Sequence, residues 1–175
     1  MKAQRLSRDS WIDAGFAALP DGGGTALRAE PLARRLGTTK GSFYWHFEDV
    51  PAFHAAMLDS WKRGAFAAIV AEMEADGAAP ERLRRFGTLV LQDQAGAALR
   101  AWGLSFPGAA AAAEQVDAER LTYLTSLMAG LGVTNADYPR AAYAALIGVQ
   151  GISSLDAADG QSAYDTLIDL ILALR

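Results

Sequence analysis

Cysteine is absent from this chain of 175 residues. Its absence excludes a disulfide framework, thiolate metal sites and cysteine nucleophiles. A folded core does not need such supports here, because 51% of the residues are hydrophobic. We therefore expect an ordinary globular chain, and the lack of cysteine suits a reducing compartment.

Long apolar segments are absent as well. No run approaches the roughly 20 residues that span a bilayer. The opening sequence MKAQRLSRD lacks the apolar centre of a signal peptide. We expect a cytoplasmic protein that makes no membrane contact.

Groups that usually carry catalysis or bind metals are few. The chain has two histidines, His46 and His54, and no acidic residue near His46 has the spacing of a metal-ligand set. Neither a Ser/His/Asp order nor a phosphate-binding loop is present, and no strand precedes the glycines Gly22–Gly24. We expect no metal, no cofactor and no enzymatic activity.

Positive charge is unevenly distributed along the chain. Residues 1–47 hold seven Lys and Arg against four Asp and Glu, a net +3 that leaves −7 for the rest of a chain whose total is −4. A split of this size can arise by chance. It also fits a protein that contacts nucleic acid only through its N-terminal part.

β-branched residues are sparse and no alternation of apolar and polar residues persists, so strands are not expected. Alanine, leucine, arginine and glutamate dominate, which favours an all-α fold of about nine helices. Ser7 and Asp49 are expected N-caps, and Pro20–Gly24 is expected to end the first helix. The expected helices are 7–19, 28–36, 40–46, 50–76, 80–95, 98–103, 109–131, 137–155 and 162–174.

The pattern around residues 28–47 is that of a helix-turn-helix. Pro31 falls in the first turn of its helix, where a missing N–H costs little. Gly37 can take the positive φ that ends a helix, and Thr38 or Thr39 can cap the next helix through its hydroxyl. Such a pair of helices suggests DNA binding through the second of them.

This second helix combines polar and aromatic residues. Lys40 at its N-terminus can meet a phosphate beside free backbone N–H groups, and Gly41 keeps the helix surface low enough for a groove to approach. The residues expected to pack inward are Leu32, Ala33, Leu36, Phe43 and Phe47. Trp45 could be core, but its place beside an inward phenylalanine favours the surface.

The segment ALRAEPLARRLGTTKGSFYWHF, Ala26–Phe47, resembles the N-terminal region of the TetR family of bacterial transcriptional regulators. The Trp11/Phe16 helix before it fits as well. The resemblance implies a helix-turn-helix DNA-binding domain, residues 1–48, and a helical ligand-binding and dimerisation domain, residues 49–175. It further implies a ligand-responsive regulator, expected to be a repressor, that binds a palindromic double-stranded DNA operator as a homodimer and is released by a small-molecule effector.

The resemblance also assigns roles to single residues. It places Thr39, Lys40 and Ser42 at the major groove. It places Tyr44, Trp45 and His46 at the backbone phosphates, with Tyr44 sometimes nearer base edges. The full set expected at DNA is Arg28, Thr38, Thr39, Lys40, Gly41, Ser42, Tyr44, Trp45 and His46.

Two positions depart from the family pattern. Arg28 opens the second helix, where a hydroxyl residue is common, and an arginine cannot act as an N-cap acceptor although it can reach a phosphate. Val50 stands near the point where the family often has a phosphate-binding lysine. Binding is therefore expected to depend more on Lys40, Arg28 and the other basic residues of the N-terminal part.

Aromatic and methionine residues beyond residue 49 are candidates for an effector pocket and equally for ordinary core. Together they suggest an apolar or aromatic effector. The candidates are Trp61, Phe86, Trp102, Phe106, Tyr123 and Met128.

The last two helices carry stripes of small or apolar residues. Either these stripes pack within one subunit, or two such helix pairs form a four-helix dimer interface. The residues concerned are Ala141, Ala145, Gly148, Ile152, Tyr164, Leu167, Ile168, Ile171 and Leu172.

Two other functions compete with a ligand-responsive repressor. One is an activator or architectural DNA-binding protein without a small-molecule effector. The other is a helical enzyme or carrier that has lost DNA binding, which the intact basic motif disfavours.

Overall fold

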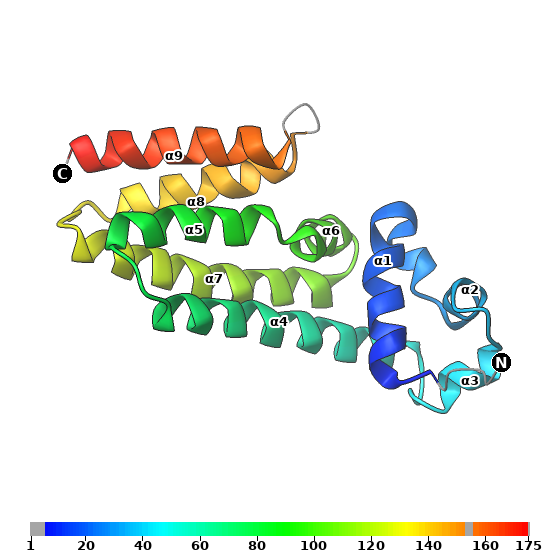
Figure 1. Ribbon diagram of the computed structural model, residues 1–175. Coiled ribbons are helices and arrows are strands. Elements are labelled where there is room, and N and C mark those ends of the chain that lie inside the picture. Colours follow the sequence, from blue (N-terminus) through cyan, green and yellow to red (C-terminus); the bar gives the residue numbers. More distant parts are fainter. Residues whose placement is uncertain (1–5, 153–155, 175) are drawn as a thin grey trace. The chain divides into compact units, whose positions relative to one another are not determined.

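A computed structural model describes residues 6–152 and 156–174 of the chain, and these residues form nine α-helices and no strand. The all-α prediction is confirmed (Figure 1). No helix in the described part of the chain is long and apolar enough to cross a membrane. The helices are α1 Arg8–Ala26, α2 Ala29–Arg35, α3 Lys40–Tyr44, α4 Val50–Glu74, α5 Ala79–Leu91, α6 Gln94–Gly103, α7 Pro107–Gly130, α8 Asp137–Gln150 and α9 Ala157–Ala173.

The chain divides into two compact units. Unit 1 comprises the described residues up to Arg63 together with Ala98–Ala113, and unit 2 comprises Gly64–Ala97 together with the described residues from Glu114 onward. The helices α4, α6 and α7 therefore contribute residues to both units. The functional division at residue 48 that the sequence suggests stays a prediction.

The first helix differs from its prediction at its C-terminal end. Ser7 caps it as expected, since its Oγ accepts from the N–H of Ser10 at 3.1 Å. Helical turns, however, continue past Pro20 and are interrupted only at Gly23, where φ is +53°. Pro20 removes one backbone hydrogen bond from the helix, and the helical turns nevertheless continue to Gly22. The predicted break within residues 20–24 is confirmed at Gly23, whereas the predicted last helical residue, Leu19, was too early.

Two other helices, α6 and α9, begin earlier than predicted, because aspartate side chains cap them. Asp93 accepts from the N–H of Gly96 at 2.8 Å, so α6 begins at Gln94 instead of Ala98. Asp156 accepts from two backbone N–H groups at 2.8 and 2.9 Å, so α9 begins at Ala157 instead of Ser162. The expected end of the eighth helix, at Leu155, lies outside the described residues. The predicted cap Asp49 is confirmed, because its carboxylate accepts from the N–H of Ala52 at 2.7 Å.

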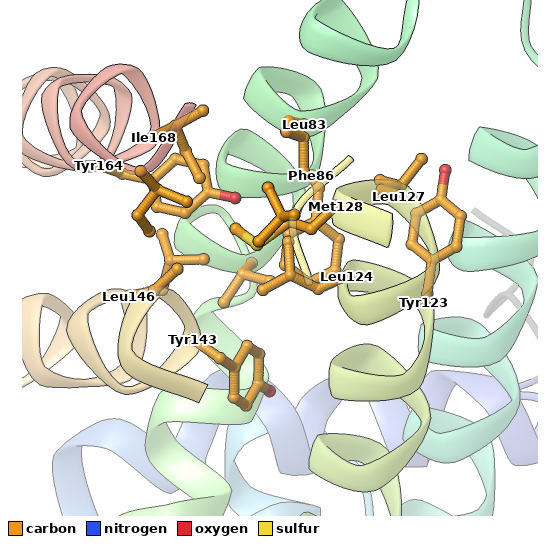
Figure 2. Packing of buried hydrophobic residues seen from close by; sticks show 14 of the residues in the cluster. Leu83, Phe86, Tyr123, Leu124, Leu127, Met128, Tyr143, Leu146, Tyr164 and Ile168 are labelled. Atoms are coloured by element: carbon orange, nitrogen blue, oxygen red, sulfur yellow. The ribbon is translucent and has the colours of Figure 1, made fainter. Parts of the chain in front are cut away.

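Unit 2 has one apolar core, built mainly from α5, α7, α8 and α9, to which Ile69 of α4 also belongs. The helices α5, α8 and α9 pack against one another. Figure 2 shows the side chains of these helices converging on the ring of Phe86, which is fully buried. The labelled members of the cluster are Leu83, Phe86, Tyr123, Leu124, Leu127, Met128, Tyr143, Leu146, Tyr164 and Ile168.

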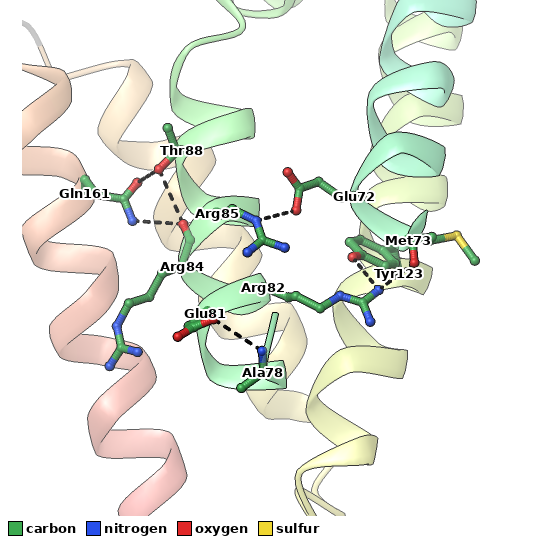
Figure 3. A network of polar contacts seen from close by, with 10 residues as sticks. All are labelled: Glu72, Met73, Ala78, Glu81, Arg82, Arg84, Arg85, Thr88, Tyr123 and Gln161. Atoms are coloured by element: carbon green, nitrogen blue, oxygen red, sulfur yellow. Dashed lines mark hydrogen bonds and ion pairs between the residues drawn. The ribbon is translucent and has the colours of Figure 1, made fainter. Parts of the chain in front are cut away.

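Polar contacts join α5 to its neighbours on two sides (Figure 3). On one side Arg85 pairs with Glu72 of α4 at 2.9 Å. On the other, Gln161 of α9 accepts from the Thr88 hydroxyl at 2.9 Å and donates to the carbonyl of Arg84 at 3.0 Å. These contacts fix the position of α5 within unit 2.

Candidate nucleic-acid interface

The helices α2 and α3 form a helix-turn-helix in unit 1. Gly37 takes a positive φ of 64° just after α2. The N–H of Thr38 then donates to the carbonyl of Ala33 at 2.9 Å, which closes the turn. The Thr39 hydroxyl accepts from the N–H of Ser42 at 3.4 Å, so Thr39 is the cap of α3.

Buried aromatic rings fix the orientation of α3. Phe43 has no exposed surface and makes edge contacts with Trp11 at 5.3 Å and Phe53 at 5.5 Å between ring centroids. Phe47 follows one turn later and is also buried, 5.2 Å from Phe43. The prediction that these two rings point inward is confirmed. Since the face of α3 that carries Phe43 packs on these rings, the opposite face of the helix is the exposed one.

The exposed side of α3 and the turn after it carry the polar and aromatic residues that the sequence assigns to DNA. Trp45 is 89% exposed and Tyr44 is 46% exposed, so the prediction that Trp45 lies at the surface is confirmed. Lys40 is exposed, with its Nζ 5.9 Å from the centroid of the Tyr44 ring. The adjacent rings of Tyr44 and Trp45 therefore expose aromatic surface on this side of the helix-turn-helix.

A surface concavity of about 570 Å³ lies between the starts of α2, α3 and α4. Its lining brings together Arg28, Lys40 and Tyr44, three of the residues predicted at DNA, and adds Arg34 and Val50. Arg34 pairs with Glu30 at 3.1 Å. Arg28 and Lys40 form no ion pair with any described residue, so both charges are available to an anionic partner.

Arg28 occupies the N-cap position of α2. Its backbone is extended, with φ −83° and ψ 154°, and its side chain caps no N–H. The expectation that an arginine fails as an acceptor here is confirmed. Arg28 therefore lines the concavity at a helix start that its side chain does not cap.

The remaining predicted residues range from exposed to partly buried. Gly41 is exposed, and a Cβ built on it would meet only the Thr39 hydroxyl, at 3.7 Å. Thr38 and Ser42 are partly buried. The ring of His46 is also partly buried and lies 6.4 Å from the ring of Trp11, so it packs on the aromatic core of unit 1.

Arg8 was overlooked as a possible contact residue. Its guanidinium lies 5.3 Å from the centroid of the Phe47 ring, so α1 brings a cation to the end of the helix-turn-helix. Arg8 is one of the seven basic residues that give residues 1–47 their net positive charge. Its position could not be read from the sequence, because the ring it covers is 39 positions further along the chain.

The six pocket candidates fall into two groups. Trp61, Trp102 and Phe106 belong to unit 1, where Trp102 stacks on Phe106 at 4.5 Å and meets His54 at 4.9 Å. The other candidates, Phe86, Tyr123 and Met128, belong to the core of unit 2.

The dimer candidates also divide by burial. Exposed or half-buried residues on α8 and just beyond it are Ala141, Ala145, Gly148 and Ile152. On α9, three side chains are buried in the core of their own chain and two lie at its edge. The buried residues are Tyr164, Ile168 and Ile171, and those at the edge are Leu167 and Leu172.

Solved structures that are similar to this chain include transcriptional regulators. A putative TetR-family transcriptional regulator from Rhodococcus sp. has a TM-score of 0.77 at 22% identity, over 97% of this chain and 100% of that chain. A transcriptional regulator from Rhodococcus sp. Rha1 has a TM-score of 0.79 at 20% identity, over 96% and 97%. A putative regulator from Saccharomonospora viridis, in complex with choline, has a TM-score of 0.78 at 17% identity, over 95% and 97%.

No family model and no curated protein sequence matches the chain significantly. The likeness to solved structures extends over nearly the whole chain and includes proteins described as TetR-family regulators. The chain therefore has the fold of these regulators.

Proposed function

We propose that this protein is a TetR-type transcriptional regulator that binds double-stranded DNA through α2 and α3. The observation that carries the proposal is the opposition of two faces on α3. Phe43 on α3 and Phe47 just after it are buried in the core, and Lys40, Tyr44 and the C-cap residue Trp45 are exposed on the other side. A helix with such a face can enter a major groove while the cations beside it hold the backbone phosphates.

The proposed interface predicts which charges matter. Lys40 and Arg28 line one concavity and have no ion-pair partner among the described residues. A cation that neutralises a phosphate releases a counterion, so removing it lowers the salt slope of binding by about one unit. Val50 lines the same concavity and supplies no charge.

Homodimerisation is part of the proposal, since a palindromic operator requires two copies of α3. Exposed residues of α8 and α9 support it. Figure 1 shows these two helices side by side. On α8, Ala141, Ala144 and Gly148 are exposed and leave room for close helix contact. Leu170 on α9 is 58% exposed, and Leu174, which caps that helix, is 70% exposed. We place the dimer contact on this exposed side, because the buried stripe of α9 is already covered within one chain.

The dimer can be tested separately from DNA binding. Leu170→Glu should shift the protein to a monomer in sedimentation equilibrium and weaken binding to a palindrome much more than binding to a half-site. Asp169→Ala, at the neighbouring position of α9, breaks an exposed ion pair with Arg84 but removes no apolar side chain, so it is the control. A Leu170→Glu protein that stays dimeric would move the interface elsewhere.

The effector is the third part of the proposal. We propose that a small molecule with an apolar or aromatic part binds unit 2 and releases the protein from its operator. The protein without this molecule is then a repressor, and we propose no enzymatic activity for it. Two observations support this part of the proposal. The core of unit 2 is rich in aromatic side chains, and one structurally similar regulator was solved in complex with choline. An effector should raise the melting temperature by mass action and lower operator affinity.

DNA binding is tested on an operator selected from random duplexes. Lys40→Ala and Gly41→Ala should both weaken it, for different reasons. The first removes a charge. The second adds a methyl group that fits the free protein, stabilises α3 by about 0.5–1 kcal/mol and obstructs the groove.

The matched control for Lys40 is Lys62→Ala. Lys62 lies on α4, 12 residues and about 18 Å along the helix from its start, and pairs with Asp59. Fluorescence anisotropy at several salt concentrations gives both affinity and salt slope. Equal affinities for the wild type, Lys40→Ala and Gly41→Ala would rule out α3 as the DNA-reading helix.

A further inference from the structure

Arg120 on α7 is the one buried charged side chain among the residues that the structure describes, with 2% of its surface exposed. Its Nη2 donates to the Oδ2 of Asp93 at 2.8 Å. Both residues belong to unit 2. A guanidinium remains protonated even when buried, so this position holds a permanent positive charge inside the helical body.

The ion pair with Asp93 uses only part of the hydrogen-bonding capacity of the Arg120 guanidinium. Its Nε and Nη1 have no hydrogen-bond acceptor in the described chain. Asp93 is already engaged through its other oxygen, Oδ1, which accepts from the N–H of Gly96 at 2.8 Å and caps α6. A buried charge that lacks part of its hydrogen bonds is costly, and it becomes favourable when an additional acceptor reaches it.

A second polar pair connects this region to the apolar core. Asp117 lies one turn before Arg120 on α7, and its Oδ1 accepts from the Tyr143 hydroxyl at 2.7 Å. The ring of Tyr143 lies 6.3 Å from that of Phe86. Figure 2 shows Tyr143 with its hydroxyl turned away from Phe86 and Leu124. The core of unit 2 therefore has apolar rings on one side of Tyr143 and charged groups on the other.

We propose that Arg120 binds the carboxylate of a small amphipathic monocarboxylic acid, whose apolar or aromatic remainder packs against Phe86 and Tyr143. The free Nε and Nη1 each share an edge of the guanidinium with Nη2, so a carboxylate can take either edge beside Asp93. The carboxylates Asp93 and Asp117 disfavour a dianion such as a phosphate monoester. The binding of this acid is argued from unit 2 alone, and only its role as the effector rests on the proposed function.

The test uses the full-length protein and two matched series of probes. One series is benzoate, phenylacetate and the linear acids from butyrate to decanoate, and the other is the corresponding amides. Melting temperature and titration calorimetry are read for each probe at pH 7.5. At least one acid should bind saturably and raise the melting temperature, and its amide, which has the same shape without the charge, should bind at least about tenfold more weakly.

Two variants separate binding from folding. The double variant Arg120→Met, Asp93→Asn removes both charges together, and the asparagine retains an oxygen to cap α6, so it should fold and lose the response to the acid. Asp93→Asn alone removes the competing carboxylate and should bind the acid more tightly than the wild type. If the ion pair were purely structural, the double variant would not lose acid binding while Asp93→Asn gains it.

The outcomes for DNA are read separately. If the double variant binds the acid as the wild type does, or if no acid in the series binds at millimolar concentration, Arg120 is structural and the proposal fails. If the wild type binds the acid but no DNA, the carboxylate site stands and the regulatory function fails. If both bind, the acid should release the operator from the wild type and leave the double variant bound.

Discussion

The indole of Trp102 lies so close to Gly24 that a Cβ atom on residue 24 would stand 2.6 Å from its Nε1. This contact brings the end of α6 to the C-terminal turn of α1 within unit 1. It explains why the glycines after Pro20 are not a simple break. One of them lets a bulky ring approach the backbone.

Gly24→Ala should therefore destabilise the protein. Because the indole has to move, the free energy of unfolding should fall by about 1–3 kcal/mol in urea denaturation. Gly64→Ala is the control, since a Cβ there would have no described atom within 4 Å beyond its own helix backbone and chain neighbours, and alanine favours a helix. If both variants unfold at the same urea concentration, the contact with Trp102 is not tight.

Arg28→Ser should separate stability from DNA binding. The backbone of residue 28 has N-cap geometry, and the serine hydroxyl can accept from the N–H of Glu30, since Pro31 has none. The variant should gain about 0.5–1 kcal/mol of stability. It should also bind DNA more weakly, with a salt slope smaller by about one unit. Unchanged affinity in an anisotropy titration would exclude Arg28 from the interface.

Val50→Lys should strengthen DNA binding. Residue 50 lines the concavity that contains Arg28 and Lys40, so a lysine there adds a third cation to one phosphate-binding surface. The salt slope should increase by about one unit. Val50→Met adds comparable length without charge and should leave the slope unchanged. A lysine variant that behaves like the methionine variant would show that the start of α4 does not meet the backbone.

Tyr164 and Tyr143 should respond in opposite ways to the loss of a hydroxyl. The Tyr164 hydroxyl is buried and has no described partner, and burial, with a smaller effect of Asp165, raises the pKa of Tyr164 far above 10. Tyr164→Phe should thus leave stability unchanged or raise it by about 1 kcal/mol, whereas Tyr143→Phe, which loses the bond to Asp117, should cost about 1–3 kcal/mol. Thermal and urea unfolding of the two variants give this comparison directly.

His54 should make the stability of the protein depend on pH. Burial lowers the pKa of His54 below 6.5, although a hydrogen bond to the backbone of Leu27 opposes the shift. The unfolded chain therefore takes up a proton below pH 6.5 that the folded chain resists, and stability falls as the pH drops through this region.

The variant His54→Asn keeps a donor for the Leu27 carbonyl and does not titrate. Its unfolding free energy should therefore lose less than that of the wild type between pH 7.5 and pH 5.5. Parallel pH profiles for the two proteins would contradict the prediction.

The sequence predicted those features that depend on neighbouring residues. Ser7, Thr39 and Asp49 cap helices as their side chains suggest, and the spacing of Phe43 and Phe47 predicted their common inward face. Each of these depends on residues within a few positions, where local hydrogen bonds and helical periodicity decide the outcome.

Long-range partners could not be predicted in the same way. Periodicity shows that a face is apolar, but not what covers it, and the α9 stripe around Ile168 proved to be buried in its own chain. The pairs Gly24–Trp102 and Asp93–Arg120 join residues far apart in the sequence. No local pattern marks either partner, because these contacts are set by the packing of whole helices.

Trp45 also has an optical consequence. Of the four tryptophans, Trp11, Trp61 and Trp102 are buried, and Trp45 alone is exposed to water. A water-soluble quencher such as iodide should therefore reach the emission of one indole out of four. If α3 docks on DNA, that emission becomes shielded, so the unlabelled protein carries its own reporter at the end of its DNA-reading helix.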